Sequence, residues 1–316
     1  MFIVDSHCDS IQKVDTLHFD LVNPYNYSKK HPQLQFVAMM TGWPDDTEKD
    51  SWRRACRYTG LYCMSIASER DKLLPVTCYA DIERAFAQGK HGALLSIESA
   101  TGLKNSPALL ERFYNVGVRV VGLTWLSNGL AKSNRVFDDG EEDTGISEIG
   151  KEFVKKGNEL GIIWDVSHAS DQTFWDLCEL SAKPVIATHS NFRALCPHSR
   201  NLTDDMAKRI IADGGMIGLN LATGFIHEEQ EKRTVEYLFK HLDHCLTLGG
   251  ENNVGFGCDI DGISSYPAPL TLEDSIHDQL IEYMQKHYAE RIVEKVAGEN
   301  YVAYLKNNLN GFNSSK

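Results

Sequence analysis

Short apolar runs rich in β-branched residues recur along the chain, and segments with helical spacing separate most of them. Runs of this kind, bounded by turn residues, are typical of strands that are buried on both faces of a sheet. Eight such runs are present, and we expect each to form a strand. The predicted strands cover residues 2–4, 61–67, 93–97, 119–124, 162–166, 184–188, 216–220 and 253–257.

Helical periodicity is clearest in the segments that precede the third, fifth and seventh predicted strands. Ile82, Ala85 and Phe86 recur at helical spacing before a glycine, and residues 149–161 and 202–215 also end in glycine. Buried strands that alternate with amphipathic helices predict a parallel sheet covered by helices. Eight such units predict an α/β fold of the (β/α)8 TIM-barrel type, with a doubly wound sheet as the alternative.

Two parts of the chain depart from this alternation. Residues 20–52, after the first strand, fit poorly as a plain crossover, so we expect an insertion that carries a helix and could help to roof a site. Residues from about 270 to 296 have helical spacing, and a polar tail follows at 307–316. We therefore expect a single domain over residues 1–316, with an insertion after the first strand and a helical C-terminal segment.

The composition is that of a globular protein, and it narrows the classes of partner. The 316 residues are 42% apolar and 24% charged, which suits one large α/β domain. The net charge of −12 disfavours nucleic acid or an anionic membrane as a partner, because both bind basic surfaces. No apolar run approaches the length of about eighteen residues that predicts a membrane span.

The cysteines and the first residues indicate a cytoplasmic protein. The eight cysteines are scattered, without a Cys-x-x-Cys pair, and residues 1–5 lack the basic region that opens a secretory signal. Scattered cysteines without such a signal predict reduced thiols. We therefore expect a cytoplasmic location.

Histidines, carboxylates and one arginine lie in or just after the apolar runs. Because the C-terminal ends of barrel strands converge on one mouth, these side chains are expected to meet in space. Histidine and carboxylate ligands together suit divalent metals such as zinc, so a metal centre is the leading hypothesis. The six motifs are Asp5-Ser6-His7-Cys8-Asp9, Ser96-Ile97-Glu98, Asp165-Val166-Ser167-His168, Ala187-Thr188-His189-Ser190, Ser199-Arg200-Asn201-Leu202 and Gly257-Cys258-Asp259.

Each motif also has an ordinary structural reading. A single histidine at a strand end is more often a hydrogen-bonded structural residue than a ligand. The alternation Asp5-x-His7-x-Asp9 would place three side chains on one face of a strand, which favours a metal site. Glu98 and Asp259 follow apolar runs, and a buried carboxylate needs a metal or a cationic partner.

Three further residues have competing interpretations. Asp165 precedes His168 and is predicted to orient a ligand instead of binding the metal. Asp261 competes with Asp259 for a catalytic role, and the motif favours Asp259. Arg200 either binds a substrate or pairs with an acidic residue shortly after it, at 204 or 205.

Together, the motifs resemble those of the membrane dipeptidase (renal dipeptidase) family of zinc peptidases. The similarity runs from Asp5 to about Gly262, with the same motif order and approximate spacing. The most specific stretch is His189-Ser190-Asn191-Phe192-Arg193-Ala194, followed by His198-Ser199-Arg200-Asn201-Leu202-Thr203-Asp204-Asp205.

The resemblance implies a (β/α)8 barrel with two zinc ions that hydrolyses dipeptides through a metal-bridging hydroxide. It implies that Glu98 bridges both ions, that Arg200 binds the terminal carboxylate of the substrate and that Asp259 assists proton transfer. A homodimer is implied in the same way. The ligands that the resemblance implies are His7 and Asp9 for the first metal, His168 and His189 for the second, and Glu98 for both.

The chain departs from the family after its fourth predicted strand. Many members have a histidine there, which is thought to bind the substrate or the developing oxyanion, whereas this chain has Trp125. An indole donates one hydrogen bond and carries no positive charge. Either the metals alone stabilise the oxyanion, or another donor such as Asn128 replaces the histidine.

Two rival functions stay open at this point. A binuclear hydrolase of another small amide or lactam would use the same metal ligands, and Arg200 favours a substrate with a free carboxylate. A non-catalytic relative would keep the scaffold without turnover, and Trp125 is the residue that supports this alternative. The native metal and the acceptance of a C-terminal D-residue also stay open.

Overall fold

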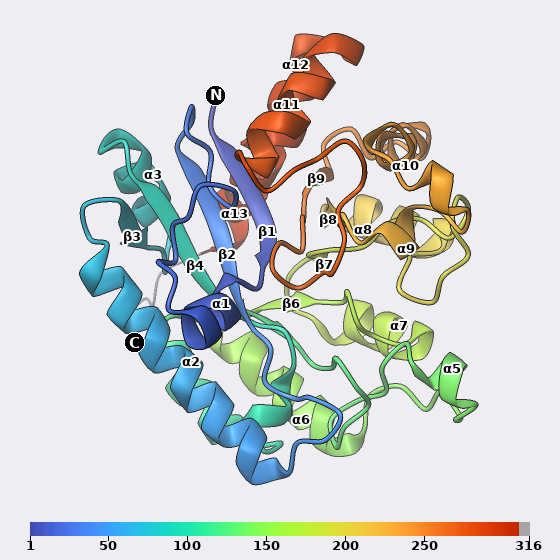
Figure 1. Ribbon diagram of the computed structural model, residues 1–316. Coiled ribbons are helices and arrows are strands. Elements are labelled where there is room, and N and C mark those ends of the chain that lie inside the picture. Colours follow the sequence, from blue (N-terminus) through green and yellow to red (C-terminus); the bar gives the residue numbers. More distant parts are fainter. Residues whose placement is uncertain (310–316) are drawn as a thin grey trace.

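The computed structural model describes residues 1–309, and a closed barrel of eight parallel strands lies at its centre (Figure 1). Each barrel strand pairs with its neighbours around the ring β1-β2-β4-β5-β6-β7-β8-β9, and the short strand β3 pairs with β4 outside that ring. The predicted (β/α)8 barrel is therefore confirmed. The strands are β1 (Ile3–Cys8), β2 (Gln33–Met39), β3 (Leu73–Pro75), β4 (His91–Ile97), β5 (Val118–Gly122), β6 (Ile163–Asp165), β7 (Ile186–Ala187), β8 (Met216–Leu219) and β9 (Val254–Phe256).

Helices connect the strands and lie around the outside of the barrel (Figure 1). Single turns of 3₁₀ helix lie at Ala100–Leu103 and Gln230–Lys232, and a π-helical turn at Lys295–Glu299 joins α12 to α13. None of the helices within residues 1–309 combines the length and the apolar character needed to cross a membrane. The helices are α1 (Ser10–Leu17), α2 (Glu48–Ser68), α3 (Tyr79–Ala87), α4 (Pro107–Val116), α5 (Val136–Asp139), α6 (Glu148–Leu160), α7 (Asp171–Leu180), α8 (Asp204–Asp213), α9 (Thr223–Ile226), α10 (Val235–Thr247), α11 (Ile276–His287), α12 (Glu290–Glu294) and α13 (Asn300–Asn308).

The predicted strand at 61–67 is wrong, because these residues form the second half of α2. The buried positions of α2 follow a spacing of three and four residues, so they lie along one face of a helix. Cys63 and Met64, which made the run look continuously apolar, are exposed. Thr47 caps the helix, and its side chain accepts a hydrogen bond from the backbone of Asp50.

The second barrel strand, β2, lies inside the segment that was expected to be an insertion. Gln33 and Gln35 interrupt its apolar pattern, although both side chains are buried. The amide of Gln33 donates to Gln35 at 2.8 Å and to the carbonyl oxygen of Asn26 at 3.0 Å. The amide of Gln35 donates in turn to the carbonyl oxygens of Asp5 and Phe36. These bonds satisfy the two buried amides inside the sheet, and no pattern of apolar residues could reveal them.

The C-terminal helices close the barrel at the end opposite its mouth. Tyr301, Tyr304 and Leu305 of α13 pack in one buried cluster with inward-facing strand residues such as Val4 and Phe36. The hydroxyl of Tyr301 also donates to Ser6 of β1 at 2.6 Å. The predicted helical C-terminal segment is thus confirmed and extends to Asn308, while most of the predicted tail at 307–316 lies outside the described residues.

Candidate metal centre

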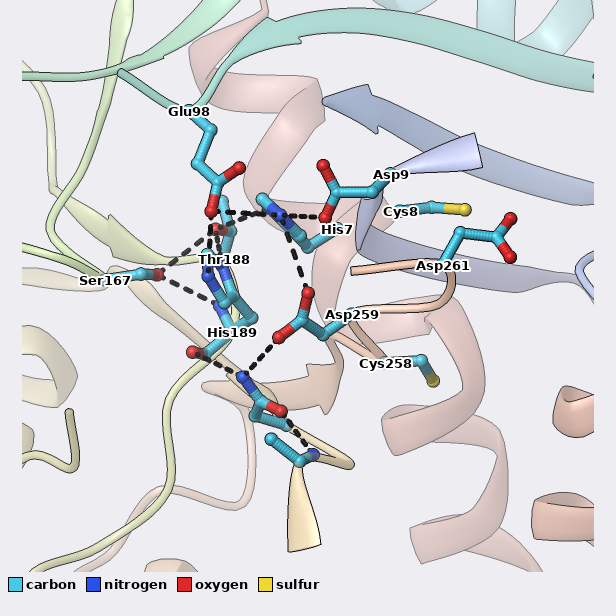
Figure 2. Close-up of polar contacts among 12 residues, drawn as sticks. His7, Cys8, Asp9, Glu98, Ser167, Thr188, His189, Cys258, Asp259 and Asp261 are labelled. Atoms are coloured by element: carbon cyan, nitrogen blue, oxygen red, sulfur yellow. Dashed lines mark hydrogen bonds and ion pairs between the residues drawn. The ribbon is translucent and has the colours of Figure 1, made fainter. Parts of the chain in front are cut away.

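The side chains predicted as metal ligands come together at the C-terminal mouth of the barrel, where all but the slightly exposed His168 are buried. Figure 2 shows His7, Asp9, Glu98 and His189 of this group. Each comes from the end of a strand or from the residues just beyond it. Parallel strands therefore bring residues that are far apart in sequence into one cluster. The cluster contains His7 and Asp9 from the end of β1, Glu98 after β4, His189 after β7 and Asp259 after β9, and His168 after β6 joins it through its contact with Glu98.

One half of the cluster surrounds the imidazole of His7. Its Nε2 atom lies 3.4 Å from Asp9 Oδ2, 3.8 Å from Glu98 Oε1 and 4.0 Å from Asp259 Oδ1. This nitrogen is buried and has no hydrogen-bond partner among residues 1–309. Burial alone would lower the pKa of His7, but Asp9, Glu98 and Asp259 together raise that pKa to about 10. The carboxylates therefore favour a cation at this position.

The other half of the cluster surrounds the same oxygen atom of Glu98, Oε1. Glu98 Oε1 lies 3.0 Å from His168 Nε2 and 3.8 Å from His189 Nε2, and the two imidazole nitrogens are 3.0 Å apart. Burial, and then the positive charge of Arg200, hold the pKa of His168 well below its ordinary value. Burial, and then the charge of His7, do the same for His189. Both rings are therefore neutral, which is the form that binds metals.

The donor set fits divalent metal ions. The buried Nε2 atom of His7 faces carboxylate oxygens without a hydrogen bond, and a cation between these groups would satisfy them. Burial, followed by the charge of Asp9, raises the pKa of Glu98 well above its ordinary value, so this glutamate also lacks a sufficient cationic partner. Imidazole nitrogen with carboxylate oxygen is the combination that zinc accepts.

A hydrogen-bonded chain holds the ring of His189. Thr188 Oγ1 donates its hydrogen to Asp165 Oδ2 at 2.6 Å. Because that hydrogen is used, Thr188 Oγ1 acts as the acceptor for the hydrogen of His189 Nδ1, at 2.8 Å. That arrangement leaves the lone pair of His189 on Nε2, which faces Glu98. Asp165 therefore orients a candidate ligand, in agreement with its predicted role, and Thr188 is the link that the sequence did not reveal.

Asp5 is separated from the His7 group. The register of β1 shifts between Asp5 and Cys8, which breaks the alternation that would have put Asp5, His7 and Asp9 on one face. Asp5 Oδ2 instead accepts a hydrogen bond from His277 Nε2 of α11 at 2.7 Å. Its Oδ1 accepts the backbone N–H groups of His7 at 3.1 Å and Cys258 at 2.9 Å. Asp5 thus joins the ends of β1 and β9, and His277 is a supporting residue that sequence reasoning missed.

The loop after β9 directs Asp259 toward His7 and Asp261 away from it (Figure 2). Asn220 donates to Asp259 Oδ2 at 3.1 Å, and burial raises the pKa of Asp259 to about 7. Asp261 accepts hydrogen bonds from Ser10 and Tyr25. A Cβ atom at Gly262 would collide with the carboxylates of Asp9 and Asp259, so only glycine allows this close approach.

Arg200 is buried beside the cluster, and no acidic residue of the following helix pairs with it. Its guanidinium donates to the carbonyl oxygens of Ser167 and His189, and its charged carbon lies 5.4 Å from the ring centre of Phe225. Asp204, its proposed rival partner, instead contacts His244 at 2.7 Å. The guanidinium therefore keeps its charge available to the cavity.

A cavity of about 480 Å³ opens above the cluster. It is large enough for a small peptide, and candidate ligands form its floor. Aromatic and cationic side chains form much of the remaining wall. The wall includes Trp43, Trp125, Arg135, Arg200 and Phe225.

The sequence profile of the membrane dipeptidase family (peptidase family M19) matches residues 1–310. The chain belongs to the membrane dipeptidase family. Family membership makes the protein a metal-dependent dipeptidase, a hydrolase that acts on peptide bonds.

Two curated relatives are each 31% identical to this dipeptidase family member. A Klebsiella pneumoniae protein, described as uncharacterized and encoded in the pqqA 5′ region, aligns over 77% of this chain and 91% of its own length. Dipeptidase tcpJ of Claviceps purpurea aligns over 72% of this chain and 53% of its own length, so the match spans about half of that protein.

Solved structures of dipeptidases share the fold. A metallopeptidase from Rhodobacter sphaeroides, bound to a phosphinate mimic of L-Ala-D-Ala, has a TM-score of 0.85 at 23% identity over 98% of this chain and 99% of that one. The probable dipeptidase PvdM from Pseudomonas aeruginosa also has a TM-score of 0.85, at 18% identity over 98% of this chain and 95% of that one. At these identities the likeness shows the shared barrel.

Trp125 occupies the position at which the resemblance to the family leads one to expect a histidine. The ring of Trp125 lines the cavity, and its centre lies 6.0 Å from that of His168. Asn128, the suggested replacement donor, is not among the cavity-lining residues. Its amide donates to Leu123 O at 2.8 Å, and its oxygen accepts from the backbone of Leu130 at 2.9 Å. The amide of Asn128 also donates to Thr101 Oγ1 at 3.2 Å, so its polar groups are used in holding the loops together.

Proposed function

We propose that this protein hydrolyses dipeptides with two divalent metal ions, for which zinc is the best-suited metal. His7 and Asp9 would hold one ion, His168 and His189 the other, and Glu98 both. One observation carries this proposal: a single oxygen, Glu98 Oε1, lies 3.8, 3.0 and 3.8 Å from the Nε2 atoms of the three histidines, in chain order. A carboxylate that lies between two sets of candidate ligands could contribute to both ions of a two-metal site, which would then supply Lewis-acid and water-activating chemistry.

Asp259 is the proposed proton carrier. Bound divalent ions would supply activation of water as hydroxide near neutral pH. Asp259 would accept the proton of the attacking water at Oδ1 and return it to the leaving amine, while Asn220 holds Oδ2. A buried carboxylate whose pKa is raised to about 7 is well matched to both transfers.

Arg200 is the proposed anchor for the terminal carboxylate. The bonds to Ser167 and His189 fix its guanidinium, so little side-chain entropy is lost when a substrate binds. A planar guanidinium binds a carboxylate through parallel charge-assisted hydrogen bonds. An anchor at a fixed distance from the metals favours substrates that end one residue beyond the scissile bond, which distinguishes a dipeptidase from an endopeptidase.

The decisive experiment is amino-acid release from L-Ala-L-Ala, L-Ala-D-Ala and the tripeptide of L-Ala by zinc-loaded protein, with and without a chelator. We expect chelator-sensitive release from dipeptides and none from the tripeptide. The L-D substrate is included because the Rhodobacter sphaeroides relative binds a mimic of it. Release from cyclic amides instead of dipeptides would favour the rival hydrolase, and no release from metal-loaded protein would favour a non-catalytic relative.

Replacing Arg200 by alanine should lower kcat/KM for L-Ala-L-Ala by about 10²-fold. The estimate follows from roughly 1.5–3 kcal/mol for hydrogen bonds to a charged group, with about 1.4 kcal/mol per tenfold change. Steady-state kinetics on the dipeptide and on its C-terminal amide provide the measurement.

The amide serves as the control for Arg200→Ala, because it lacks the carboxylate that Arg200 is proposed to bind. The wild-type protein should lose most of its activity on the amide, and the substitution should cause little further loss there. An equal loss on both substrates would show that Arg200 acts on the fold and not on the carboxylate.

A further inference from the structure

We propose that Arg135 makes this dipeptidase selective for dipeptides that carry an acidic side chain. The inference rests on the proposed function and adds a substrate class to it. Arg135 immediately precedes α5 and lines the same cavity as His168 and Arg200. The cavity therefore contains two guanidinium groups that come from different loops of the barrel mouth.

Among the side chains that the structure describes, Arg135 has no acidic partner, although the chain has an excess of acid. The protein has 44 aspartate and glutamate residues against 32 lysine and arginine residues, and many of its arginines form ion pairs. None of the carboxylates described within residues 1–309 forms an ion pair with Arg135. Examples of paired arginines are Arg54 with Asp46, Arg84 with Asp81, Arg193 with Asp171 and Arg209 with Glu179.

An aromatic wall holds this guanidinium over the cavity. The charged carbon of Arg135 lies 5.3 Å from the ring centre of Trp125, a distance typical of a cation–π contact. Trp43 supports the same indole, with ring centres 5.7 Å apart. A guanidinium that makes a cation–π contact can still donate hydrogen bonds to a carboxylate through its N–H groups.

The two guanidinium groups suit two carboxylates. In the proposed function Arg200 binds the terminal carboxylate of the dipeptide, so Arg135 is left for a second anionic group. The three carboxylates nearest His7 belong to the metal centre, and none of them pairs with Arg135. Among dipeptides, only those with an aspartate or glutamate residue carry a second carboxylate.

The distances allow such a substrate to reach Arg135. Ring contacts of 6.0 Å and 5.3 Å connect His168 to Trp125 and Trp125 to the Arg135 guanidinium. Each residue of an extended peptide spans about 3.5 Å, and a glutamate side chain extends further from it. The guanidinium of Arg135 lies over the ring of Trp125. A substrate side chain that reaches this part of the wall would therefore meet a positive charge, which favours an acidic side chain over an apolar one.

The test compares kcat/KM for two matched substrate pairs, Glu-Ala with Gln-Ala and Ala-Glu with Ala-Gln, in zinc-loaded wild-type protein and in Arg135→Gln. We expect wild-type protein to prefer glutamate over glutamine by about tenfold in one of the two pairs, through a charge-assisted contact. Arg135→Gln should abolish that preference while kcat/KM for the glutamine substrate changes by no more than about twofold.

Arg112→Gln is the matched control, because it removes the same charge from an exposed position on α4 that does not line the cavity. It should keep the wild-type preference, which separates a local contact from a long-range effect of charge. Equal cleavage of both members of each pair by wild-type protein would overturn the acidic selectivity and leave the dipeptidase function intact. A preference that survives in Arg135→Gln would likewise overturn it, and failure to cleave any dipeptide would overturn both proposals.

Discussion

Glu98→Gln should abolish dipeptide hydrolysis, with a fall in kcat/KM of more than about 10⁴-fold, since activation of water shifts its pKa by several units. The substitution should also lower the metal content from two ions to one or fewer per chain. Glutamine keeps the size of the side chain and one carbonyl oxygen but loses the negative charge. Metal content after dialysis, together with steady-state kinetics on L-Ala-L-Ala, provides the measurement.

The expected size of this effect follows from the position of Glu98. Its Oε1 atom faces the ligand nitrogens of His7 on one side and of His168 on the other, so one substitution weakens both proposed ion sites. Glu69→Gln is the matched control, because Glu69 is also a buried glutamate but accepts the backbone N–H groups of Leu21 and Val22 away from the cavity. Full metal content with near wild-type activity in Glu98→Gln would contradict the bridging role.

The barrel could be predicted from the sequence because apolar residues predominate in most of its strands. Strands β4 and β5, for example, have no charged residue except His91 and Arg119, and the predicted runs overlap both. The prediction failed where burial does not depend on apolar character. The two buried glutamines of β2 are hydrogen-bonded to each other and to the surrounding backbone. The apolar run at 61–67 belongs to a helix whose other face is exposed.

The grouping of the site residues could be predicted for a related reason. Histidines and carboxylates directly after buried strands have to lie at one mouth of a parallel barrel, whichever helices connect the strands. His277 could not be predicted in this way, because α11 follows the last strand and its contact with Asp5 depends on how that helix packs. Asn128 shows the opposite kind of error. The sequence suggested that its side chain could donate to the substrate, but the folded chain uses that side chain in hydrogen bonds to Leu123 and Leu130.

Asp259→Asn should lower kcat by about 10²–10⁴-fold, the usual contribution of general acid–base catalysis, and should leave two metal ions bound. Asparagine fits the same space but accepts no proton from water near neutral pH. Asn220 already donates to Oδ2, so the substitution changes only the group that faces His7 through Oδ1. Kinetics on L-Ala-L-Ala and metal content on the same sample provide the measurement.

Asp261→Asn tests whether this loss belongs to the reaction or to the loop. Asp261 lies two residues away in the same loop, also has a left-handed backbone, and directs its carboxylate to Ser10 and Tyr25. If Asp259 carries the proton, Asp261→Asn should reduce kcat by less than about tenfold. If both variants lose activity equally while keeping their metals, the loop geometry is what matters, and the proton must be carried by a group other than Asp259. Loss of metal in Asp259→Asn but not in Asp261→Asn would instead indicate that Asp259 is a metal ligand. Its Oδ1 atom lies 4.0 Å from His7 Nε2, a separation at which both atoms could bind one ion.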